Sequence, residues 1–185
     1  FYHCFQMILF DFVKYLLHLE VFVLLYLVGY LMYQKMILLI NCRKYSIRMP
    51  YRKQHSSLTA KNVKGNTHII HRYGPIHLED LSQDVKVEGS HNEIFGQNLS
   101  GIVEIENSYE KIILLDVGPT KIIGNRSYIE IDEIDGDLGI TDRYSKVSLN
   151  NLHGNLTIDG KNLGVYGSTI SADKINISSS YDDIK

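Results

Sequence analysis

The chain has 185 residues, enough for one domain, and its net charge of −2 conceals two parts of opposite charge. Residues 1–54 carry 7 Lys and Arg against 2 Asp and Glu, whereas residues 55–185 carry 12 against 19. An acidic surface repels phosphate backbones, so nucleic acid is excluded as an expected partner. Both cysteines, Cys4 and Cys42, lie in the first part, so disulfide bonds contribute nothing to the second.

The first part, residues 1–54, is an apolar and basic head. Its residues 15–33 form 19 mostly apolar positions, close to the roughly 20 that a membrane-spanning helix needs. The strictly apolar run from Val21 to Tyr33 has 13 residues, which is nearer to a signal-peptide core or a buried segment. Three interpretations of this helical segment stay open: a membrane anchor, a signal-peptide remnant, and a buried or non-native lead-in.

A basic flank follows the apolar stretch, with Lys and Arg residues from Lys35 to Lys53. Positive charge after a spanning helix favours the cytoplasmic side for this flank and for the chain that follows it. The head therefore predicts membrane contact and a location at the cell envelope, membrane-associated or exported, although its basic flank argues for the cytoplasmic side.

From Leu58 onward the sequence repeats with a short period of about 18 residues, and three positions of the repeat hold only apolar side chains. Counting each coil from position 0, that position holds Leu58, Ile76, Ile94, Ile112, Ile129, Val147, Val165 and Ile184. Position 5 holds Val63, Leu81, Leu99, Val117, Ile134, Leu152 and Ile170. Position 11 holds Ile69, Val87, Ile105, Ile123, Ile140, Ile158 and, one residue late, Ile177. A short fixed period of this kind is typical of a solenoid, in which each coil covers the next.

Within a coil the apolar residues alternate as they do in strands, for example Val147 with Leu149 and Leu156 with Ile158. Each coil therefore contains two short strands and two bends, and stacked coils pair in parallel about 4.8 Å apart. The predicted fold class is all-β: a single-stranded parallel β-solenoid, or β-helix, of about seven coils over residues 55–185. We expect right-handed coils, and the repeat is expected to be truncated at Lys185.

The bends repeat as regularly as the core. Position 4 holds residues that mostly tolerate the left-handed conformation: Asn62, Asp80, Asn98, Asp116, Glu133, Asn151 and Thr169. Position 15, at the far bend, holds Tyr73, His91, Tyr109 and Tyr144, with Tyr181 in the longer last coil. Aromatic side chains at a bend offer contact area at low entropic cost. Tyr73, Tyr109, Tyr144 and Tyr181 are therefore the candidate binding edge, against the alternative of simple packing at the bend.

Short motifs in the repeat resemble a known family. They are Asn62–Asn66, Arg72–Gly74, Ile134–Leu138 and Asn151–Ile158. Chains of such Val-x-Gly-x-Val-x-Ile coils are similar to the bacterial adhesin-like β-solenoid repeat family, a domain family of unknown function, over about residues 55–185. The resemblance implies a bacterial, envelope-associated and non-enzymatic protein, and it brings no catalytic residues.

No catalytic, metal or cofactor site is predicted. The histidines of the repeat occupy different coil positions and are expected to be exposed, whereas a zinc site needs several at one point. The acidic residues are scattered over outward positions; Glu130 and Asp132, for example, alternate with Ile129 and Ile131. Coils of nearly constant length leave no long loop to wall a cleft. An enzyme acting on polysaccharide is retained only as an outsider.

Two functions of different kinds remain. The first is a non-enzymatic, envelope-associated adhesin-like or interaction module that binds a surface, a glycan or a protein. The second is a self-assembling bactofilin-like scaffold, because open solenoid ends carry unpaired strand edges that associate end to end.

Overall fold

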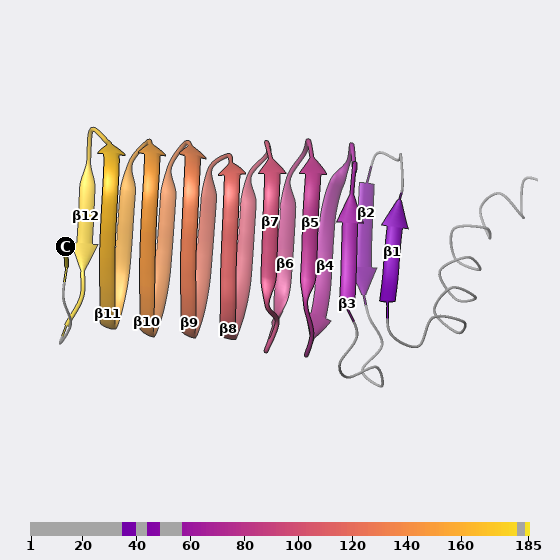
Figure 1. Ribbon diagram of the computed structural model, residues 1–185, viewed down its shortest axis with the longest axis horizontal. Coiled ribbons are helices and arrows are strands. Elements are labelled where there is room, and N and C mark those ends of the chain that lie inside the picture. The colour runs from indigo at the N-terminus through magenta and orange to yellow at the C-terminus, as the bar shows by residue number, and fades with distance from the viewer. Residues whose placement is uncertain (1–34, 40–43, 49–56, 181–183) are drawn as a thin grey trace, which may run out of the picture. The chain divides into compact units, whose positions relative to one another are not determined.

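The structure is a computed structural model that describes residues 35–39, 44–48, 57–180 and 184–185. All regular elements of this part are strands, and they form one 12-stranded sheet that winds into a parallel β-solenoid (Figure 1). The strands are β1 (Lys35–Leu39), β2 (Lys44–Arg48), β3 (Ser57–Lys61), β4 (Asn66–Arg72), β5 (Ile76–Leu81), β6 (Val85–Ser90), β7 (Ile94–Leu99), β8 (Val103–Val117), β9 (Thr120–Asp135), β10 (Leu138–His153), β11 (Leu156–Ser171) and β12 (Ile175–Ser178). The predicted all-β solenoid is confirmed, with the coil length that the sequence repeat indicates.

Part of the predicted head belongs to this sheet. Strand β1 pairs with β3, and β2 pairs in parallel with β4, where Ile47 lies opposite Ile69. The candidate anchor at residues 15–33 lies outside the described residues. Within the described residues, no helix is long and apolar enough to cross a membrane.

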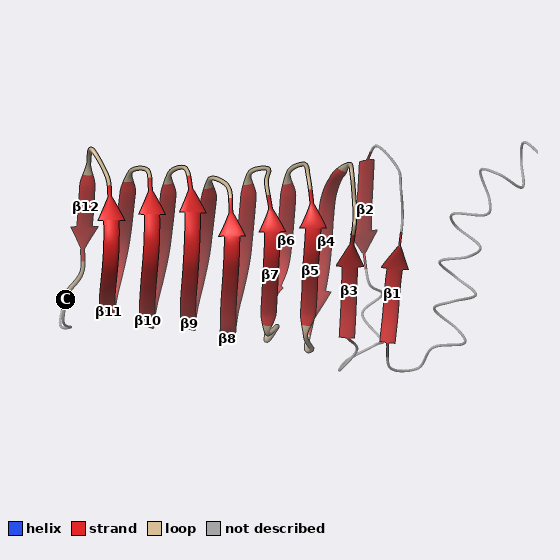
Figure 2. Cartoon of the chain, turned by 45° about the horizontal axis from the view of Figure 1, so that its top comes forward, coloured by secondary structure: helices blue, strands red, loops and turns tan. Residues whose placement is uncertain are grey.

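Each strand pairs with the strand one coil further along the chain. Between β10 and β11 the partners are one full repeat apart, as in Leu138 with Leu156 and Val147 with Val165. Strands β8 to β11 continue round one bend without losing this pairing, so each contributes to two faces (Figure 2). In Figure 1 the front strands β5 and β7 run upward, the rear strands β4 and β6 run downward, and the chain advances from right to left, which is a right-handed coil.

The core consists of the predicted apolar columns. Position 0 from Leu58 to Val165 and position 5 from Val63 to Leu152 are at most 2% exposed. Burial falls in the last described coil, where Ile177 is half-buried and Ile184 is 52% exposed. A side chain there packs against one neighbouring coil instead of two.

One member of the position 11 column was predicted wrongly. Ile122, not Ile123, pairs with Ile105 and Ile140, and Ile122 is 0% exposed whereas Ile123 is 38% exposed. The coil that begins at Ile112 is one residue shorter than the coils on either side of it, and it is shortened in the bend between Val117 and Thr120. The register of the following strand therefore moves by one residue, and one residue is enough to exchange the inner and outer faces of a strand.

The first bend has the predicted left-handed backbone. The seven residues of position 4 all have positive φ angles, from 52° at Asn151 to 58° at Glu133. Asparagine and aspartate adopt this conformation at little cost because their side chains hydrogen-bond locally. Some of them also contact across coils: the Asn98 amide donates to Asp80 Oδ1 at 2.8 Å.

Candidate functional site

The second bend carries a second column of left-handed residues. Their φ angles lie between 54° and 61°, and the residues are Tyr73, His91, Tyr109, Arg126, Tyr144 and Asn162. A non-glycine residue at positive φ is uncommon, and five of these six carry an aromatic or basic side chain. Because the same conformation recurs at the same bend, their side chains stand one above another. We call Tyr73, His91, Tyr109, Arg126 and Tyr144 the aromatic–cation column.

The side chains of this column contact one another over five successive coils. The His91 ring stacks between Tyr73 and Tyr109, with ring centroids 4.9 and 4.7 Å apart. The Arg126 guanidinium carbon lies 5.9 Å from the Tyr109 ring centroid and 5.5 Å from that of Tyr144. Arg126 also donates to the Tyr109 hydroxyl at 3.4 Å. Stacking and cation–π contacts each stabilise such pairs by about 0.5–1.5 kcal/mol, so the column is ordered before any ligand binds.

Three of the four residues of the candidate binding edge, Tyr73, Tyr109 and Tyr144, lie in this column. The fourth, Tyr181, lies outside the described residues. Sequence reasoning missed Arg126, because the shortened coil places it one residue before position 15. The sequence did contain a signal for Arg126, because this basic residue lies between Tyr109 and Tyr144 at nearly the repeat period.

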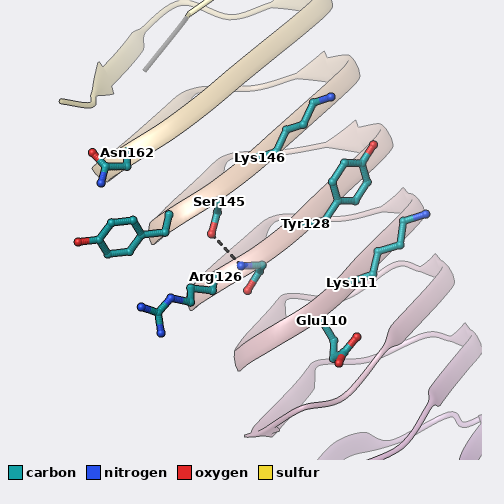
Figure 3. Close-up of a pocket in the computed structure, with 9 residues that line it drawn as sticks. Glu110, Lys111, Arg126, Tyr128, Ser145, Lys146 and Asn162 are labelled. Atoms are coloured by element: carbon teal, nitrogen blue, oxygen red, sulfur yellow. Dashed lines mark hydrogen bonds between the residues drawn. The ribbon is translucent and has the colours of Figure 1, made fainter. Parts of the chain in front are cut away.

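A second column lies two residues further along each coil. Lys111 and Lys146 are the register partners of Tyr128 in the preceding and following coils. Their Nζ atoms lie 5.2 and 5.9 Å from the Tyr128 ring centroid. Figure 3 shows Lys111, Tyr128 and Lys146 on one side of the bend and Arg126 on the other. We call this second set the lysine–tyrosine column.

A shallow groove of about 800 Å³ runs between the two columns. Glu110, Ser127, Ser145 and Asn162 complete its lining (Figure 3). Lys111 lies 3.6 Å from Glu130, a partly exposed pair that screening makes weak. Within the described part of the chain, neither Arg126 nor Lys146 forms a salt bridge. The groove thus combines three basic side chains, exposed tyrosines and a single carboxylate.

The backbone beneath the groove is fixed by a buried polar interior. The Ser127 N–H donates to Ser145 Oγ at 2.8 Å, and that hydroxyl donates to the Arg143 carbonyl at 3.1 Å. In the three coils before it, the Asn92 and Asn107 amides donate to the His71 carbonyl and the Asn92 carbonyl at 2.9 and 2.8 Å. Sequence reasoning expected the histidines to be exposed, but His71 is 2% exposed.

Asp142 is a second exception, because it was expected among outward acidic residues and is 1% exposed. Its Oδ1 accepts a hydrogen bond from the Arg143 N–H at 2.6 Å. Burial raises the pKa of the Asp142 carboxyl, against the opposing effect of the Arg143 N–H and of the neighbouring Ser145 and Ser127 hydroxyl groups. A smaller depression of about 350 Å³ lies here, and exposed Asp159 contributes to its lining. The Asp142 side chain therefore points into the interior of the bend, where it accepts the Arg143 N–H, and not into solvent.

Asp142→Asn is expected to stabilise the fold at neutral pH by about 1 kcal/mol, because it removes a buried charge and keeps the acceptor for Arg143. The folded-state pKa is raised, so the folded protein retains the proton longer than the unfolded chain. The contribution of the Asp142 carboxyl to the free energy of unfolding is therefore fully present when the pH lies below the unfolded-state pKa. It is lost as the pH rises through the folded-state pKa. Urea unfolding at pH 7 and at pH 3.5 checks this: the gain should vanish at the lower pH. An equal gain at both values would contradict the assignment.

Among the described residues, no group of three or more His, Cys, Asp and Glu side chains could hold a metal ion. No protein-family model matches the chain, and neither the curated proteins nor the solved structures gave a match.

Proposed function

We propose that the solenoid is a non-enzymatic, adhesin-like binding module of the cell envelope, and that it binds a polysaccharide along its second bend. The observation that carries this proposal is the aromatic–cation column, which runs unbroken over five coils from Tyr73 to Tyr144. A row of stacked bends with the same backbone conformation presents an aromatic or basic side chain at each of these coils, about 4.8 Å apart. Such a row suits a ligand that is itself a repeating chain.

The geometry of the groove supports an extended ligand. The groove is shallow and open along the bend, whereas pockets for small molecules enclose most of the ligand surface. Its aromatic and basic side chains are already held by their neighbours, so binding costs little side-chain entropy. Tyrosine hydroxyl groups, lysine and arginine supply hydrogen bonds for the hydroxyl groups of a sugar chain.

The chemistry of the groove supports binding without turnover. Glycoside hydrolysis uses two carboxyl groups that flank the bond to be broken. The described lining of the groove holds one carboxylate, Glu110. Asp142, the acidic residue with a raised pKa, is buried in the bend interior. We therefore infer that the bend binds a polysaccharide without cleaving it.

The test replaces three tyrosines of the column in the full chain. Tyr73, Tyr109 and Tyr144 are all changed to Asn, which the bend already accepts at Asn162 with φ 54°. Migration of the protein is then measured in native gels that contain soluble polysaccharides, neutral (amylose, xylan) or acidic (polygalacturonate). We expect retardation of the parent protein by at least one polymer and about tenfold weaker affinity for the triple variant.

The matched control is Leu115→Gln. Leu115 is 37% exposed on β8, near the opposite bend, and Gln97 occupies the same position one coil earlier. This variant should bind like the parent, and circular dichroism should show that all variants are folded. Equal retardation of parent and triple variant would overturn the proposal, as would the absence of retardation by every polymer. Release of reducing sugar that a carboxylate substitution abolishes would indicate an enzyme, and filaments of the purified chain without polysaccharide binding would indicate a scaffold.

A further inference from the structure

We infer that the ligand is an anionic linear polysaccharide, whose acidic groups bind Lys111, Arg126 and Lys146 in the groove between the two columns. This inference rests on the proposed function, because it names the substrate class of the same bend. It is carried by charge, by the spacing of the basic residues and by the exposure of Tyr144.

The charge of the groove is opposite to that of the rest of the repeat. Residues 55–185 carry 12 basic and 19 acidic side chains, yet the groove lining holds Lys111, Arg126 and Lys146 against Glu110. An anionic polymer is therefore attracted at this bend and repelled by most of the remaining surface. The net negative charge of the rest of the repeat thus favours this one track for an anionic ligand, a preference that a neutral ligand would not have.

The basic residues are spaced along the coil axis. Lys111 and Lys146 stand two coils apart, about 9.6 Å by the strand spacing, and Arg126 lies in the coil between them. Arg126 belongs to the opposite column, so the cations alternate across the groove (Figure 3). A single small anion cannot contact cations on three coils, whereas a chain lying along the axis places one acidic group near each. The pattern thus favours a polymer over a free acid.

Tyr144 supplies the surface for a sugar ring. Arg126 covers one face of its ring, and the next coil carries Asn162 at the same position, so no aromatic ring stacks on the other side. Tyr144 is accordingly 57% exposed, whereas Tyr109, which lies between His91 and Arg126, is half-buried. An amphipathic tyrosine beside cations that form no salt bridge provides apolar contact for the ring and charge for its acidic substituent. Duplex nucleic acid is disfavoured because it is much wider than a single sugar chain and would bring its second strand of phosphates over a repeat that is net acidic outside the groove.

The experiment compares two polymers with one backbone. Polygalacturonate and its fully methyl-esterified form differ chiefly in charge, and their affinities for the full chain are measured by isothermal titration calorimetry. We expect the acidic form to bind at least about tenfold more tightly, with affinity that falls as salt rises. Arg126→Gln and Lys146→Gln should each weaken binding of the acidic form about tenfold. Lys121→Gln, an exposed lysine outside the groove, should not change it.

Each other outcome has a defined meaning. If the methyl ester binds as tightly as the acid and Arg126→Gln has no effect, the anionic assignment is wrong. The proposed function then still stands, provided that the tyrosine variant loses binding to either polymer. If neither polymer nor any neutral glycan binds, both proposals fail together. If free galacturonate bound as tightly as polygalacturonate, the inference that the ligand is a polymer would be wrong. If single-stranded DNA bound more tightly than either polysaccharide, the ligand would be a nucleic acid and not a polysaccharide.

Discussion

Ile122→Asp is expected to destabilise the fold by more than about 4 kcal/mol, because it places a charge without a partner between two coils. Ile122 is 0% exposed and packs between Ile105 and Ile140 in the column of position 11. A loss of this size is a large fraction of the total stability of a typical domain. Urea unfolding followed by circular dichroism should show a much earlier transition or none.

The matched control for this prediction is Ile123→Asp, one residue further along the same strand. Ile123 is 38% exposed, and Thr141 occupies its position in the next coil. The new carboxylate lies in register with Glu106, so we expect a cost of about 0.5 kcal/mol from like charges in adjacent strands. If the two variants lost the same stability, or if Ile123→Asp lost more, the register of β9 described above would be wrong.

Gly160→Ala is expected to destabilise the fold by about 2–3 kcal/mol through a collision between neighbouring coils. An added Cβ would lie 2.6 Å from Leu163 Cδ1 and would overlap the Asp142 carbonyl oxygen of the coil before it. That carbonyl is backbone held in the parallel ladder between β10 and β11, so it cannot rotate away as a side chain would. The bend interior accepts a side chain at this position in alternate coils, where Asn107 and Asp142 stand on either side of Gly124.

Gly139→Ala is the control for this substitution. A Cβ at Gly139 meets no atom within 4 Å, and this glycine lies on β10, the strand that pairs with the strand of Gly160. The substitution should leave stability unchanged or raise it slightly, since alanine restricts the unfolded chain more than glycine does. Thermal unfolding of the two variants shows whether the loss of stability comes from the collision at Gly160 or whether any glycine-to-alanine change in β10 and β11 destabilises the fold. Equal melting temperatures would contradict the tight packing of the bend.

The proposed ligand site depends on residues that are distant in the sequence. Lys111, Tyr128 and Lys146 are each about one repeat apart in the chain, yet they form one column because successive coils pair in register. The same pairing places Arg126 between Tyr109 and Tyr144. A change that shifted one coil would therefore alter binding at the bend without touching a ligand contact.

The sequence alone determined the period, the two strands in each coil and the apolar columns from Leu58 to Val165, because burial in a stacked coil requires the same kind of side chain at the same position. It also indicated the left-handed bends at position 4, since asparagine and aspartate adopt that conformation readily. Only the tertiary structure decided which bend of the short coil after Ile112 lacks a residue. Both Ile122 and Ile123 satisfy an apolar column, and the count of residues cannot distinguish them.

The tertiary structure also decided what the second bend contains. The register of the shortened coil brings Arg126 into the column of tyrosines, and the packing of the bend turns His71 and Asp142 inward. Periodicity reports whether a side chain faces in or out along a strand, where alternation is fixed by the pleat. At a bend the direction of each side chain depends on the backbone conformation and on the coil beneath it. For this reason the core of the solenoid could be predicted from the sequence, whereas the basic groove required the stacked coils.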